Sequence, residues 1–63
     1  MTLAEWTKEV KKRLIDMDDT VAHMSRELGI TTQYVYQTLG GKEPRQCTVD
    51  RISNYVGIEP IKL

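Results

Sequence analysis

The sequence predicts an all-α fold, a small bundle of about four helices that ends in a short extended tail. Apolar residues recur at intervals of three and four positions, which is the spacing of one face of a helix. Threonines precede several of these segments and glycines follow them, as helix caps do. With 63 residues, the chain has room for one domain, residues 1–63, and for one core.

The first helix is expected from about Leu3 to Asp16. Thr2 can cap it, and Glu5 stands three residues later, where it completes a capping box. An apolar stripe at spacings of four, four and three predicts its buried face: Trp6, Val10, Leu14 and Met17.

Residues 20–39 predict two short helices joined by a tight turn. The first runs from about Val21 to Leu28 and the second from about Thr32 to Leu39. Thr20 and Thr31 are placed to cap them, and Gly29 suits the left-handed end of the first helix. Two helices joined by a short turn containing Gly form a helix-turn-helix, although ordinary helical hairpins share that pattern.

The composition of the second helix favours contact with DNA bases. Its polar side chains include Thr32, Gln33, Tyr36 and Gln37, and the two glutamines lie on one face because they are four residues apart. A Gln amide can pair with the N6 and N7 edge of adenine. No Asp or Glu occurs from Leu28 to Gly41, so no acidic group in this segment would repel phosphates. The sequence therefore predicts that this helix enters the major groove.

The chain resembles the Cro and C-repressor family of phage and bacterial regulators, the lambda-repressor-like domain, over about residues 6 to 58. The matching positions are Thr20, Met24-Ser25, Leu28-Gly29, Ile30, Thr31, Val35 and Gly41-Lys42. The resemblance implies base contacts at Thr32, Gln33 and Gln37, with Tyr36 beside them. It also implies that the loop with Lys42 and Arg45 contacts the DNA backbone, and we expect Thr20, Thr31 and Tyr34 to contribute there.

Three positions depart from the family pattern. Val21 stands where many members have a phosphate-binding Gln, and Ser25 replaces the usual Ala. Thr38 occupies a late position of the second helix that is usually apolar. We therefore expect Leu39 to pack in its place.

The last helix and the tail complete the expected fold. Thr48 is expected to cap a helix that stops at Gly57, with an inner face of Val49, Ile52, Tyr55 and Val56. Pro60 discourages a further helix, so residues 58–63 form a tail. Ile58 is expected to fold back onto the domain, and Ile61 and Leu63 are hypothesised to make dimer contacts.

The charges balance, with nine Lys and Arg against nine Asp and Glu, so the chain is not a strongly basic nucleic-acid coat. Along the first helix lie Lys8, Lys11, Lys12 and Arg13. They form either a phosphate-binding run or a solvated face, and the neighbouring Glu5 and Glu9 favour the solvated face.

Residues that could carry other chemistry do not combine into a site. His23 is the only histidine, and no Cys, Ser or Asp pattern around it fits a catalytic triad. Cys47 is the only cysteine, which rules out an internal disulfide, and no metal-ligand spacing occurs. No apolar run could span a membrane and no signal-peptide pattern occurs, so a cytoplasmic protein is expected. We expect no enzyme activity, cofactor, metal, membrane or small-molecule substrate.

The residues and the resemblance together predict a small Cro-like transcriptional repressor. Its expected partners are a double-stranded DNA operator and a second copy of the chain, as a homodimer on an inverted repeat. Two alternatives stay open. One is a protein-binding module of the same fold, such as an antirepressor, and the other is a DNA-bending accessory factor in recombination.

Overall fold

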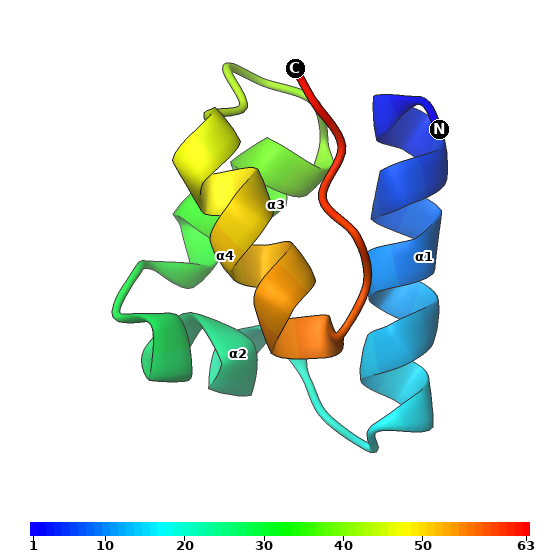
Figure 1. The fold of residues 1–63 in the computed structure, drawn as a ribbon. Helices are drawn as coiled ribbons and strands as arrows, with labels where there is room; N and C mark the ends of the chain where they lie inside the picture. The colour runs from blue at the N-terminus through cyan, green and yellow to red at the C-terminus, as the bar shows by residue number, and fades with distance from the viewer.

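A computed structural model describes residues 1–63 and contains four α-helices and no strand (Figure 1). They are α1 (Leu3–Asp16), α2 (Val21–Leu28), α3 (Thr32–Leu39) and α4 (Gln46–Val56). The all-α prediction is confirmed, and the first three helices have the bounds that the sequence predicts. None of the helices is long and apolar enough to cross a membrane.

The predicted caps of the first three helices are present. Thr2 and Glu5 form a reciprocal capping box, with backbone-to-side-chain distances of 3.0 and 3.2 Å. The hydroxyl of Thr20 accepts the backbone N–H of residue 23, and that of Thr31 accepts the N–H of residue 34, each at 3.1 Å. Gly29 ends α2 with a φ of 71°, a left-handed conformation that glycine adopts without steric cost.

The predicted start of α4 is wrong. The helix begins at Gln46, and its N-cap is Arg45, which makes no side-chain capping hydrogen bond. Thr48 already lies within the first turn, because its backbone N–H donates to the carbonyl of Arg45 at 3.1 Å. Its hydroxyl lies 3.1 Å from the Tyr34 hydroxyl instead, so Thr48 joins α4 to α3 rather than capping α4. Gly57 ends the helix, as predicted.

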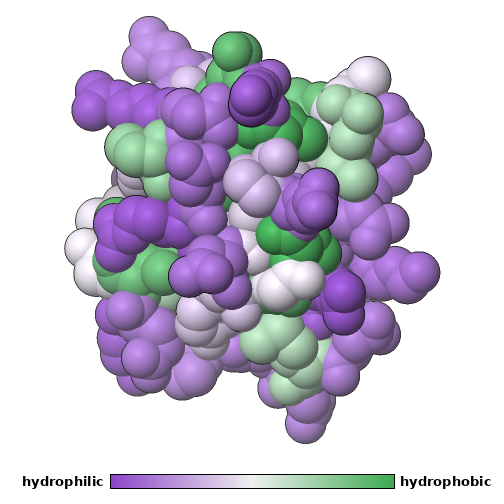
Figure 2. Space-filling view, viewed as in Figure 1, coloured by the Kyte–Doolittle hydropathy of each residue, from purple (hydrophilic) through white to green (hydrophobic).

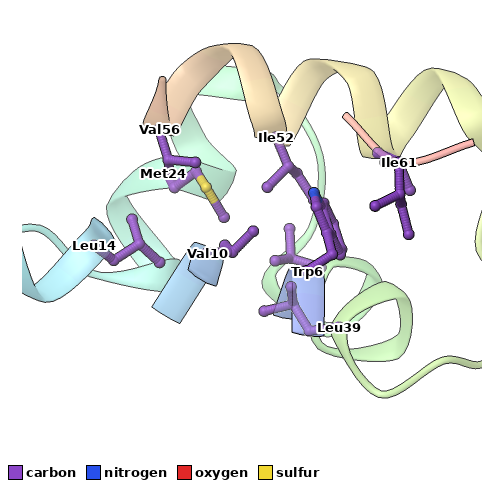
Figure 3. Close-up of a cluster of buried hydrophobic side chains, with 10 residues drawn as sticks. Trp6, Val10, Leu14, Met24, Leu39, Ile52, Val56 and Ile61 are labelled. Carbon is purple, nitrogen blue, oxygen red and sulfur yellow. The ribbon is translucent and has the colours of Figure 1, made fainter. Parts of the chain in front are cut away.

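One hydrophobic core joins all four helices and the tail (Figure 3). It consists of Trp6, Val10, Leu14, Met24, Val35, Leu39, Val49, Ile52, Val56 and Ile61. The indole ring of Trp6 is fully buried, and its N–H donates to Ser53 on α4 at 2.8 Å. Thr7 donates its hydroxyl hydrogen to the carbonyl of Leu39 at 2.9 Å, which fixes α1 against the end of α3.

Two predictions about the core need correction. Met17 does not extend the stripe of α1, because it lies beyond the helix at the C-cap and its exposed fraction is 45%. Leu39 packs in the core as predicted, but it does not replace Thr38, which is fully buried. The Thr38 hydroxyl donates to the Tyr34 carbonyl at 3.1 Å, so its burial leaves no polar group unpaired.

The C-terminal tail returns along α4 to the N-terminal end of the fold, where both termini lie (Figure 1). The Gln46 side chain holds it, donating to the Ile61 carbonyl at 2.6 Å and accepting the Leu63 N–H at 2.7 Å. Ile58 packs against the core, as predicted. Ile61 is only 8% exposed in the same core, so the structure corrects its predicted dimer role. Leu63 is 55% exposed, and its dimer role stays a prediction.

Replacing Ser53 by alanine tests the contact between α1 and α4. Ser53→Ala leaves the buried indole N–H without a partner, which should lower the free energy of unfolding by about 1–3 kcal/mol. Asn54→Ala, on the exposed side of the same helix, should change it by no more than about 0.5 kcal/mol. Urea denaturation of both variants makes the comparison. Equal effects would show that the Trp6 hydrogen bond does not stabilise the fold.

Candidate functional site

The helices α2 and α3 pack on each other and form the predicted helix–turn–helix. α2 buries Met24 and Ser25, and α3 buries Val35, Thr38 and Leu39. The Ser25 hydroxyl donates to the Val21 carbonyl at 2.7 Å, so this polar residue is satisfied inside the interface. Because α3 has only eight residues and one side packs inward, its opposite side faces solvent.

The exposed side of α3 carries most of the predicted base contacts. Gln33, Tyr36 and Gln37 are all exposed, Tyr36 to 57%. Together with Gly40 and Lys42 they line a shallow hollow of about 350 Å³. Thr32 is half-buried at the start of the helix and does not line this hollow. The structure therefore brings three of the four predicted base-contacting residues together in a hollow that is lined by one lysine and by no acidic residue.

The residues predicted to contact the DNA backbone differ in their surroundings. The hydroxyls of Thr20 and Thr31 accept backbone N–H groups, which leaves the hydrogen of each able to donate to a phosphate. Tyr34 is half-buried, and its hydroxyl pairs with that of Thr48, so it is already partly used. Lys42 and Arg45 are exposed on the loop that follows α3.

The start of α2 is unfavourable for a phosphate. Val21, at the position where many Cro and C-repressor proteins have a phosphate-binding Gln, is half-buried and packs against the core. The Asp19 carboxylate accepts the backbone N–H of Thr20 at 2.7 Å and therefore sits directly beside that cap. Its negative charge would repel a phosphate, which counts against Thr20 as a backbone contact.

A hydrogen-bonded group of side chains links the start of α2 to α4. The Tyr55 hydroxyl donates to Asp19 Oδ2 at 2.5 Å, and His23 Nδ1 lies 2.8 Å from Asp19 Oδ1. On its other side, His23 Nε2 lies 3.4 Å from a carboxylate oxygen of Glu27. The hydrogen bond from Tyr55, together with that from the Thr20 N–H, lowers the pKa of Asp19. The same bond to Asp19 raises the pKa of Tyr55 to about 12.

Two contacts between segments that are distant in the sequence cannot be predicted from local sequence patterns. Arg51 is exposed, and its guanidinium group donates to the Leu28 carbonyl at the end of α2. Tyr55 was expected only as an inner-face residue of α4, and its partner Asp19 is 36 positions away. Caps and stripes are local patterns, whereas contacts between distant segments depend on how the helices pack.

The chain contains one cysteine and one histidine, and both lie outside α3. Cys47 is exposed and forms no disulfide, and the ring nitrogens of His23 lie near Asp19, Glu27 and the Tyr55 hydroxyl. No group of three or more His, Cys, Asp or Glu side chains is placed to hold a metal ion. What the exposed side of α3 offers is hydrogen bonding and contact by two amides, a phenol ring and an ammonium group.

Comparison with known proteins gives no match, whether with protein-family models, with curated proteins or with solved structures.

The bond between Tyr55 and Asp19 predicts how stability depends on pH. A raised pKa of Tyr55 means that the folded state keeps a proton that the unfolded state loses from about pH 10. The free energy of unfolding should therefore fall as pH rises from about 10 to about 12. The lowered pKa of Asp19 acts at the other end, where stability falls as acid protonates Asp19.

Urea denaturation at acid, neutral and alkaline pH tests the hydrogen bond between Tyr55 and Asp19. Tyr55→Phe should remove the contribution of this residue to the alkaline fall and reduce the acid one. Tyr36→Phe is the matched control, because Tyr36 is exposed and its hydroxyl makes no hydrogen bond within the protein. An unchanged pH profile in Tyr55→Phe would contradict the assigned bond.

Proposed function

We propose that this protein is a sequence-specific DNA-binding regulator that inserts α3 into the major groove. The observation that carries the proposal is the exposed face of α3, where two glutamines and a tyrosine converge on an acid-free hollow. An α-helix fits the major groove of B-DNA, and the first residues of the second helix meet the base edges in helix-turn-helix proteins. The resemblance of residues 20–42 to Cro and C-repressor proteins supports the same function.

Each exposed group of α3 has a chemical task in this proposal. Gln33 and Gln37 donate and accept at the N6 and N7 edge of adenine, which contributes about 1–3 kcal/mol of discrimination for each well-placed pair. Tyr36 packs its ring against a base, with the methyl group of thymine as a suitable partner. Thr32 contributes from the start of the helix with the part of its side chain that remains exposed.

The backbone contacts come mainly from the loop after α3. Lys42 lines the same hollow as the glutamines, and Arg45 follows on the exposed loop. The net charge of zero limits the phosphate contacts that one chain can make, so affinity depends on base contacts and on two chains binding together. We therefore propose a homodimer on an inverted repeat with half-sites about 34 Å apart. These properties fit a cytoplasmic, Cro-like repressor that binds a DNA operator.

Two observations favour a second candidate function. Val21 packs on the core where related regulators have a phosphate-binding Gln, and the chain carries no excess of positive charge. A protein-binding module of the same fold would share both features. In that case the exposed side of α3 would contact another protein, and the chain would show no sequence preference in DNA.

Replacing Gln33 by alanine tests the role of α3. Gln33→Ala should lose about 1–3 kcal/mol of discrimination at one base pair of each half-site while most of the salt-dependent affinity remains. Binding to the preferred site and to single-base variants of it, measured by fluorescence anisotropy, gives this difference. Unchanged preference would contradict the assignment of Gln33 to base contact.

Lys42→Ala is the contrasting variant from the same hollow. It removes a charge and no base contact, so it should weaken binding to all sequences by similar factors. The slope of log affinity against log salt should become shallower by about one. Loss of sequence preference in Lys42→Ala, with the slope unchanged, would contradict the assignment of Lys42 to a phosphate and would indicate a base contact instead.

A further inference from the structure

A second hollow, of about 330 Å³, lies between α1 and the end of α3. Two lysines of α1, Lys8 and Lys11, line it. The other lining residues are Leu3, Ala4, Thr7, Leu39, Gly40 and Gly41. The hydrogen bond from Thr7 to the carbonyl at the end of α3 fixes α1 in this place. The lysines are therefore held beside the helix that is proposed to contact bases, although they are distant from it in the sequence.

The two hollows adjoin, because Gly40 lines both of them. The glycines at positions 40 and 41 place no side chain between the α3 face and the lysines of α1. Neither hollow is lined by an Asp or Glu, and the charged residues that line them are Lys8, Lys11 and Lys42. The hollow that carries Lys8 and Lys11 thus adjoins the exposed polar side of α3.

The distribution of charge makes this surface the favourable side for a polyanion. No Lys or Arg forms an ion pair with a carboxylate, since the ion pairs of the structure involve only His23. Lys8 and Lys11 are therefore not held in ion pairs. At the opposite end of the helix-turn-helix, Asp16, Asp18 and Asp19 precede α2. A duplex lying along α3 would meet acidic groups at one end and lysines at the other.

We propose that Lys8 and Lys11 bind phosphates of the duplex that α3 contacts, so that α1 forms part of the DNA interface. This inference rests on the proposed function. Residues three apart on a helix have Cβ atoms about 5–6 Å from each other, so the two lysines can contact neighbouring phosphates of one strand. The wider outer surface of α1 is hydrophilic in Figure 2, but Lys12 and Arg13 do not line the hollow and are not part of this site.

The test compares two double variants that remove the same charge. Lys8→Gln with Lys11→Gln removes the proposed contacts, whereas Arg13→Gln with Arg26→Gln removes two exposed charges that line neither hollow. Binding to a random-sequence DNA duplex is measured over a range of salt concentrations. The slope of log affinity against log salt should become shallower by about two in the lysine variant and stay at the wild-type value in the arginine variant.

The outcomes separate this inference from the proposed function. A wild-type slope in the lysine variant, with folding verified by circular dichroism, overturns the inference. Equal changes in both double variants also overturn it, because a general loss of charge would then explain the effect. In either case, selection of a preferred DNA sequence by the wild-type protein would still support the proposed recognition of bases by α3. Failure of the wild-type protein to bind any duplex would overturn both.

Discussion

The burial of Trp6 against α4 is the contact on which the rest of the structure depends. Its indole ring is the largest buried side chain, and its N–H pairs with Ser53 across 47 positions of the chain. Around it meet α1, the end of α3 through Leu39, and the tail through Ile61 (Figure 3). A chain of this size buries a small core, so one large aromatic residue contributes a large share of its hydrophobic stabilisation.

This core determines which side of α3 remains exposed. An isolated helix of eight residues is not stable in water, so α3 depends on packing for its structure. Val35, Thr38 and Leu39 turn inward, and the glutamines four residues apart then face outward together. The contact of Thr7 with the end of α3 sets the position of α1 at the same time. One packing arrangement thus produces both the exposed polar face of α3 and the lysines beside it.

The sequence predicts much of this fold because its signals are local. Cap residues and glycines lie within a few positions of the helix ends they set, and the bounds of the first three helices agree with the prediction. The errors concern partners that are distant in the chain. Thr48 resembles a cap, but its hydroxyl meets Tyr34 of another helix. Ile61 resembles a free apolar residue, but Gln46 holds its backbone, and the side chain enters the core. The exposed side of α3 follows from periodicity, whereas the surface that it shares with Lys8 and Lys11 requires the tertiary structure.

Selection from a randomised duplex library at moderate salt tests most directly the proposal that α3 recognises a DNA sequence. The retained DNA is sequenced after the selection. A consensus with two inverted half-sites, their centres about one helical turn apart, is the predicted result. Absence of any enriched sequence, for a protein that circular dichroism shows to be helical, would contradict the claim and would favour a protein partner for the exposed side of α3.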